Sequence, residues 1–296
     1  MQSENLKGAV LMIVSMAAFT SSDTFMKLLA DELPLFQSLL WRGVLVSLAL
    51  GLWALRAGAF RATVAPQDHI LIAVRTLADT AAAWFFFQAL FQMPIANLGA
   101  ILLALPLTVT LAAAVFLREP VGWRRMLAIL VGFSGVLLIA RPDTGGFDRN
   151  ATSALIAVGF FTLRELTTRR ISRAVPSVRI AFWNVVSVML LGAIGSAGQT
   201  LVVPSVWTLT LLSGTAVCFV AASLVAVMAM RHGELGFVMP YRYTSLIWAL
   251  ILGLLVFDEW PDALTMAGAA LIVGTGMFTF YRERLIAARL PAPGLR

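Results

Sequence analysis

Cysteine, histidine and charged residues are all scarce in this chain, and each shortage excludes a class of protein. The single cysteine, Cys218, allows no internal disulfide and no cysteine metal cluster. The two histidines, His69 and His232, stand at the edges of apolar segments, where no zinc or iron site is readable. Only 12% of the 296 residues are charged, against roughly 25% in ordinary soluble domains. The sequence therefore predicts no metal and no cofactor.

Apolar residues make up 60% of the chain, more than a soluble fold of this length can hide from water. The formal net charge is +7, but the basic residues stand in short gaps between apolar segments. That distribution is typical of membrane orientation, so we expect a lipid bilayer around the chain and no nucleic-acid partner. The start of the chain lacks a positive n-region and a cleavage site, so the first apolar segment is expected to remain as a spanning helix.

Ten apolar segments are long enough to cross a bilayer, which takes about 20 helical residues. Their connections are short and show no room for a soluble domain, and no segment alternates with a period of two. The fold class predicted is an all-α integral membrane protein with ten transmembrane helices. The segments are Leu6–Leu29, Leu35–Leu55, Ile70–Phe91, Ile95–Leu117, Trp123–Ala140, Ala151–Ile171, Ile180–Ala197, Val206–Met230, Gly236–Phe257 and Ala263–Tyr281.

Lysine and arginine gather on one side of these predicted spans. Assigning the connections to alternate sides places 15 basic residues on one side and only Arg141 and Arg149 on the other. Cytoplasmic loops carry such an excess of positive charge, so both termini are expected in the cytoplasm.

The two halves of the chain repeat each other. The aligned pairs are Asp23 with Glu165, Lys27 with Arg169, Pro34 with Pro176 and Trp41 with Trp183 at a shift of 142, and Glu119 with Glu259 at a shift of 140. We expect two five-helix repeats, residues 1–145 and 146–296. Because five is odd, the second repeat enters the membrane from the opposite side. Inverted repeats around a midplane site are the architecture of many secondary transporters.

Eight charged residues remain inside the predicted spans, where each costs at least ~2.5 kcal/mol. They are Lys27, Arg42, Arg75, Arg164, Arg242, Asp23, Asp79 and Glu165. Lys27, near the end of its span, is expected to snorkel to the surface. The other seven are expected to line a cavity or pathway, with static structural pairing as the alternative. The balance of +2 favours a substrate that carries a carboxylate or phosphate, which arginine binds with a planar fork.

Spacing and depth suggest partners for these charges. Residues four apart share a helix face, which predicts three pairs. These pairs are Arg75 with Asp79, Asp23 with Lys27, and Glu165 with Arg169. Depth in the membrane also places Asp23 near Arg42, and Glu165 near Asn184 in the repeat. Our hypothesis is an outer gate at Asp23 and Arg42 and an inner gate at Glu165 and Asn184. The acids either carry a coupling proton or are fixed partners of arginine.

Aromatic side chains close to the arginines are candidates for contact with the apolar part of a metabolite, with ordinary packing as the alternative. The candidates are Tyr241 and Tyr243, which flank Arg242, together with Trp248 and Trp84. Pro106 falls within the fourth span and should loosen it, either as a hinge or as a kink. Small residues four apart, Ala128 with Gly132 and Ala270 with Gly274, permit close helix contact and leave a monomer and a homodimer equally open.

Several short motifs resemble the drug/metabolite transporter superfamily, specifically its EamA type. They are Pro94-Ile95-Ala96, Leu105-Pro106-Leu107, Leu117-Arg118-Glu119-Pro120 and Val131-Gly132-Phe133-Ser134-Gly135-Val136. Arg118 replaces a glycine of the family pattern, and Leu246 stands where Pro106 would repeat. The resemblance implies alternating access through a central cavity lined mainly by spans 1 to 4 and 6 to 9.

The resemblance leads us to expect a multi-pass carrier of the bacterial inner membrane that exports amino acids or related small metabolites, as YddG-type exporters do. It is equally similar to uptake carriers for S-adenosylmethionine or riboflavin, so uptake of a larger anionic or nucleotide-like compound is the alternative. An enzyme or a channel is the alternative from another class. No nucleophile–base constellation or phosphate-binding loop supports an enzyme, and an inverted repeat favours a carrier over a channel.

Overall fold

The computed structural model describes residues 2–61, 64–119, 121–141, 149–172, 174–232 and 235–289. Every regular element in these ranges is a helix. Pro120 of the family-like motif and the expected repeat boundary after residue 145 lie outside the described residues.

The helices of the first half follow the predicted spans closely. They are α1 (Gln2–Leu28), η1 (Leu29–Asp31), α2 (Leu35–Arg56), η2 (Ala59–Arg61), α3 (Pro66–Leu90), α4 (Ile95–Leu102), α5 (Leu105–Phe116) and α6 (Trp123–Ala140). Proline at the N-cap of α2 and of α4, and in the first turn of α3, explains why these helices begin where they do.

The helices of the second half also form close to the predicted spans. They are α7 (Arg149–Thr168), α8 (Ser177–Gly195), α9 (Val206–His232), α10 (Leu235–Val238), η3 (Met239–Tyr243), α11 (Thr244–Phe257) and α12 (Ala263–Arg289). In the part of the chain that the structure describes, nine helices are long and apolar enough to cross a membrane. The predicted sixth span is not among the nine, although α7 forms there as a helix that carries Arg164 and Glu165.

Two of the predicted spans are broken. The fourth divides into α4 and α5, with Pro106 in the first turn of α5. Proline has no N–H to continue the helical ladder, so the break is the loosening that the sequence predicts. The ninth divides into α10, η3 and α11, with Pro240 in the first turn of η3.

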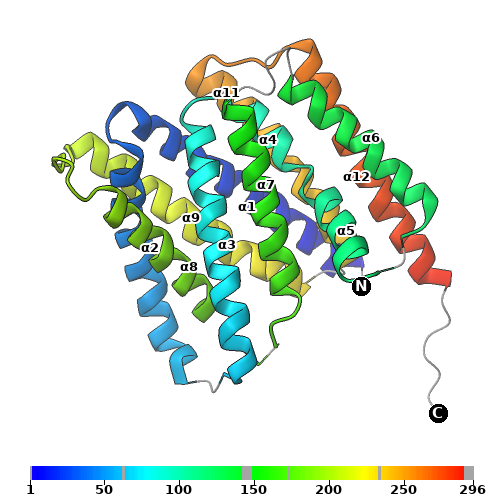
Figure 1. The fold of residues 1–296 in the computed structure, drawn as a ribbon, viewed down its shortest axis with the longest axis horizontal. Helices are drawn as coiled ribbons and strands as arrows, with labels where there is room; N and C mark the ends of the chain where they lie inside the picture. The colour runs from blue at the N-terminus through cyan, green and yellow to red at the C-terminus, as the bar shows by residue number, and fades with distance from the viewer. Residues whose placement is uncertain are drawn as a thin grey trace.

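Each long helix of the first half packs mainly against one helix of the second half. The principal pairs are α1 with α9, α2 with α8, α3 with α7 and α6 with α12. Figure 1 shows α6 and α12 side by side along one edge, away from α2 and α8. The main buried core joins residues of α1, α3, α4, α7 and α9. The polar residues described below therefore lie where the two halves meet.

The helices α6 and α12 cross with their backbones in contact. A Cβ on Gly135 would lie 2.6 Å from the carbonyl oxygen of Gly268, and one on Gly268 would lie 2.5 Å from that of Gly135. Of the small residues that the sequence singled out, Gly132 packs against Leu107 of α5, whereas Gly274 faces open space. Gly132 therefore serves packing within this chain.

Candidate functional site

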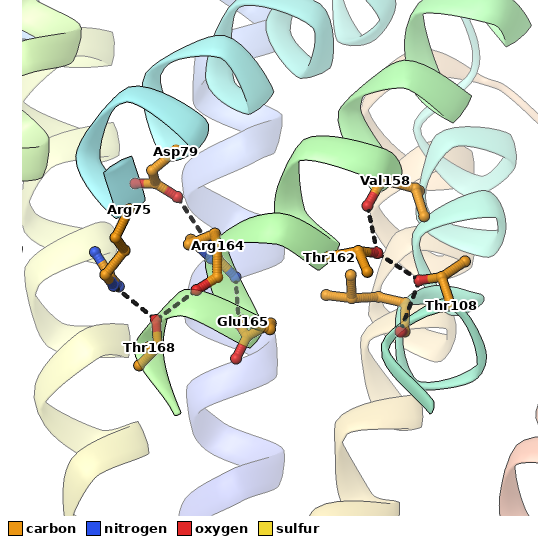
Figure 2. A network of polar contacts seen from close by, with 9 residues as sticks. Arg75, Asp79, Thr108, Val158, Thr162, Arg164, Glu165 and Thr168 are labelled. Atoms are coloured by element: carbon orange, nitrogen blue, oxygen red, sulfur yellow. Dashed lines mark hydrogen bonds and ion pairs between the residues drawn. The ribbon is translucent and has the colours of Figure 1, made fainter. Parts of the chain in front are cut away.

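A polar network joins α3 to α7 in the interior (Figure 2). The Arg164 guanidinium donates to an Asp79 carboxylate oxygen at 2.8 Å and to a Glu165 carboxylate oxygen at 2.7 Å. Arg75 donates from Nε to the Thr168 hydroxyl at 2.8 Å. Charge-assisted bonds of this length are about twice as strong as neutral ones. One arginine thus holds carboxylates from both helices.

The ion pairs of the structure differ from those predicted along single helices. Asp79 forms its ion pair with Arg164, although it also interacts electrostatically with Arg75. Lys27 pairs with Glu259, and the Arg169 side chain lies by Glu119. In each case the charged partner lies on a different element, which only the packing of the helices brings close.

The expected inner gate also has a different arrangement. Asn184 of α8 accepts a hydrogen bond from the Thr76 hydroxyl of α3 at 3.2 Å. Glu165 takes Arg164 as its partner. Asn184 therefore joins α3 to α8, one helix away from the carboxylate with which the sequence paired it.

Arg42 of α2 lies between two aromatic rings. Its guanidinium carbon is 4.6 Å from the ring centre of Phe219 and 5.1 Å from that of Phe87. Such cation–π contacts stabilise a cation that has left water. Asp23 and Asp79 both interact electrostatically with Arg42. The predicted proximity of Asp23 and Arg42 is present, and Asp79 links them to the network of α3 and α7.

The arginines and acids form one connected set. Asp79 interacts electrostatically with Arg42, Arg75 and Arg164. Glu165 interacts likewise with Arg242, which sits at the break of the ninth span. The set holds four arginines and three acids, which are Arg42, Arg75, Arg164, Arg242, Asp23, Asp79 and Glu165.

Lys27 does not snorkel, contrary to the sequence prediction. Its Nζ lies 2.6 Å from a Glu259 carboxylate oxygen, donates to the Met93 carbonyl at 2.9 Å, and sits 4.7 Å from the Phe257 ring centre. Glu259 follows α11 and lies outside the predicted ninth span, so it was not among the eight charges counted within the spans. Because Glu259 neutralises Lys27, the net formal charge of the remaining residues within the spans is +1 and not +2.

The aromatic candidates occupy three different places. Tyr241 and Trp248 pack onto a cluster built around Met12 and Met16 of α1. Tyr243 points to α12, where its hydroxyl lies against Gly276.

Trp84 stacks on Phe36 with ring centres 4.5 Å apart and lines an apolar hollow between α3 and α8. The rings that Arg42 and Arg164 contact are instead those of Phe87, Phe161 and Phe219. No charge or spacing marks these phenylalanines in the sequence, because stacking depends on which helices pack together.

Several buried hydrogen-bond donors have no protein partner, and three of them belong to arginines of this set. Among the described residues they include Arg42 Nε, Arg75 Nη1, Arg164 Nε, Trp41 Nε1 and Trp248 Nε1. Leaving a buried donor unpaired costs about 1–3 kcal/mol. A ligand rich in acceptor oxygens would satisfy them.

Comparison with known proteins finds similarity to membrane transporters. Residues 6–141 match the EamA-like transporter family. An S-adenosylmethionine uptake transporter of Rickettsia conorii is 25% identical over 94% of both chains. The pseudopaline exporter CntI of Pseudomonas aeruginosa is 27% identical over 90% of this chain and 94% of its own. A solved crystal structure aligns with a TM-score of 0.62 at 19% identity, covering 96% of this chain and 99% of that one, and shows a shared fold.

The apolar helices and these relatives indicate a multi-pass membrane transporter and not an enzyme. The first half of the chain is thus similar to the EamA-like transporters, and the relatives that match nearly the whole chain are transporters as well.

Proposed function

We propose that the chain is a secondary transporter that exports amino acids or related carboxylate metabolites across the bacterial inner membrane. The observation that carries the proposal is the buried set of four arginines and three acids, with its surplus of +1 and its unpaired donors. A carboxylate would accept hydrogen bonds from those donors and neutralise the surplus positive charge.

Alternating access between two inverted five-helix repeats, residues 1–145 and 146–296, is the mechanism that we propose. Four helix starts support the repeat. Leu35 and Ser177 differ by 142 residues, while Pro66 and Val206, Ile95 and Leu235, and Trp123 and Ala263 each differ by 140. The pairing of helices supports it as well, because exchanging the halves turns the α1–α9 pair into the α7–α3 pair.

Sidedness and topology belong to the same proposal. Ten spans, with α7 as the sixth, place both termini on one side, which the basic loops identify as the cytoplasm. In Figure 1 the start of α1 and the end of α12 lie toward the same lower edge.

Uptake of a larger metabolite is the second candidate, and the names of relatives favour it. S-adenosylmethionine uptake is ascribed to the Rickettsia relative, and riboflavin transport to a Vibrio cholerae relative that is 28% identical over 64% of this chain. S-adenosylmethionine carries a sulfonium cation beside its amino acid group. An interior with surplus positive charge opposes that cation, so we rank the amino acid export proposal first.

Counterflow into liposomes of purified protein tests both candidates. The vesicles are loaded with unlabelled compound and exposed to radiolabelled amino acids, riboflavin or S-adenosylmethionine, with and without a proton gradient. We expect exchange of amino acids, reduced at least tenfold in Arg242→Ala. Arg56→Ala is the matched control, because Arg56 is exposed at the end of α2.

Each outcome decides one point. Exchange of S-adenosylmethionine or riboflavin alone would replace export of amino acids by the uptake candidate. Acceleration by the proton gradient that is lost in Asp23→Asn would assign that acid to coupling, whereas equal rates would indicate a facilitator. Absence of any exchange by folded protein would contradict the proposed substrates.

A further inference from the structure

Two ion pairs stand at equivalent places in the two halves. Lys27, in the last turn of α1, pairs with Glu259, which follows α11. Arg169 follows α7 and lies by Glu119, which follows α5. Lys27 and Arg169 differ by 142 residues, and Glu119 and Glu259 differ by 140. Exchanging the halves therefore turns one pair into the other.

The backbone presents both glutamates in the same way. The residues before them, Arg118 and Asp258, adopt left-handed conformations with φ of 55° and 53°. The Glu119 N–H donates to the Ala113 carbonyl at 3.3 Å, and the Glu259 N–H donates to the Gly253 carbonyl at 2.9 Å. Each bond runs from the glutamate N–H to the carbonyl six residues earlier, so both helices end in the same kind of turn. The match in backbone geometry makes chance similarity of the two pairs a poor explanation.

The two pairs lie at opposite ends of the helices. In Figure 1, α5 and α7 end toward the lower edge, whereas α11 ends at the upper edge. The two pairs therefore stand at opposite faces of the helix assembly.

The first pair is tightly formed. Its atoms are 2.6 Å apart, and the Lys27 and Glu259 side chains are only 10% and 26% exposed. Glu259 also accepts the Ile95 N–H at the start of α4 at 3.2 Å, while Lys27 reaches the Met93 carbonyl. The pair ties together the end of α1, the start of α4 and the end of α11.

The second pair is loose. Arg169 and Glu119 are 3.9 Å apart, which is too far for a hydrogen bond, and their side chains are 53% and 52% exposed. Solvent screens such a pair, so it contributes little in this conformation. The same device is thus engaged at one end of the molecule and disengaged at the other.

We propose that Lys27–Glu259 and Arg169–Glu119 are two reciprocal locks of the transport cycle, each engaged when the other is open. The proposal rests on the proposed alternating-access function and names its gating residues. Both glutamates follow the second part of a broken span, so movement of α5 or α11 about its break carries one glutamate toward its cation. With the predicted sidedness, the structure has the outer lock closed and the inner lock open.

Thiol labelling in oriented vesicles tests the locks without any substrate. Reporter cysteines replace Thr24, a turn below Lys27, or Leu166, its equivalent at a shift of 142, in a Cys218→Ser background. Thr24 is buried in the present conformation. A membrane-impermeant maleimide is then applied from each side.

Removing the outer lock should open the outer side. Glu259→Gln keeps an acceptor for the Ile95 N–H but loses the charge, so we expect Thr24→Cys to label about fivefold faster from outside, the change that roughly 1 kcal/mol gives a two-state equilibrium. Leu166→Cys should label more slowly from inside. Glu119→Gln should shift both rates the opposite way, and the double variant should return toward the parent.

Asp262→Asn is the matched control. It breaks the ion pair of Asp262, which precedes α12, with Arg141, which follows α6; these side chains are 51% and 47% exposed. Should Glu259→Gln fold poorly, Lys27→Met removes the same ion pair by replacing its cation. Unchanged rates in folded lock variants, equal effects of Asp262→Asn, or faster labelling of both reporters at once would overturn the proposal. Reciprocal labelling without counterflow would retain the locks and remove only the proposed substrates.

Discussion

Arg118 occupies a backbone conformation that suits glycine better than any other residue. Its φ of 55° brings Cβ close to the following carbonyl oxygen, which costs roughly 1–2 kcal/mol. Glycine avoids the cost but has more conformational entropy to lose on folding, roughly 0.5–1 kcal/mol. The glycine of the family pattern at this place thus has a physical reason.

Arg118→Gly should therefore stabilise the protein by about 0.5 kcal/mol. Thermal unfolding of purified protein in detergent measures the change, which we expect to raise the melting temperature by about 1–2 °C. Arg118→Ala removes the same charge but keeps the strained conformation, so it serves as the control. An equal gain in both variants would assign the effect to the charge.

Of the three acids within the spans, Asp79 is the one whose replacement should reduce stability and transport the most. It holds Arg164 at 2.8 Å, with both side chains at most about a fifth exposed. Removing one partner of a buried ion pair costs about 3–5 kcal/mol, and Glu165 remains as a second partner of Arg164. We expect Asp79→Asn to lose roughly 2–3 kcal/mol of stability and most of the transport.

Thermal unfolding and counterflow on the same preparation check this prediction. Asp262→Asn, which breaks a half-exposed pair, should cost less than about 1 kcal/mol and leave transport unchanged. A stable Asp79→Asn protein without transport would show that Asp79 serves the substrate more than the fold.

At the scale of helices, the break between α4 and α5 is the feature most open to a direct test. Pro106 cannot donate to the Leu102 carbonyl, so the fourth span cannot run straight through. Pro106→Ala restores the donor. We expect a more continuous span, unchanged or higher stability, and a transport rate reduced at least threefold, because movement about the break becomes harder.

Pro94→Ala is the control, since Pro94 precedes α4 and its loss restores no bond within a helix. Transport rates and melting temperatures of the two variants are compared in the same liposomes. A Pro106→Ala protein that transports at the parent rate would show that the break is a fixed kink.

The helices were predictable because their signals are local. Pro34, Pro94 and Gly122 are the N-cap residues of α2, α4 and α6. The residues that follow them, Leu35, Ile95 and Trp123, are both the predicted and the observed helix starts. The charged partners were not predictable from spacing. Asp79 with Arg164 and Lys27 with Glu259 are separated by many residues and meet only after the helices pack.

At the scale of the whole molecule, the internal repeat of the sequence marks two ion pairs that a count of the charges within the spans did not reveal. The repeat aligns Lys27 with Arg169 and Glu119 with Glu259. In the fold, Lys27 pairs with Glu259 and Arg169 lies by Glu119. Two alignments at nearly the same shift thus mark residues that meet across the halves. The phenylalanines around Arg42 have no such mark, because an apolar residue in an apolar span carries no signal of its own.

Topology is the property of the whole molecule on which the reciprocal locks depend. An inverted repeat requires residue 145 and the C-terminus to lie on opposite sides of the membrane, whereas a parallel repeat requires an even number of helices in each half. Alkaline phosphatase, active only outside the cytoplasm, can be inserted between residues 145 and 146 of the full chain. We expect high activity there, low activity at a C-terminal fusion, and low activity for an insertion after residue 172, which follows α7. The last insertion also decides whether α7 crosses the membrane despite Arg164 and Glu165: high activity after both 145 and 172 would mean that it does not, and the two lock pairs would then lose their equivalence.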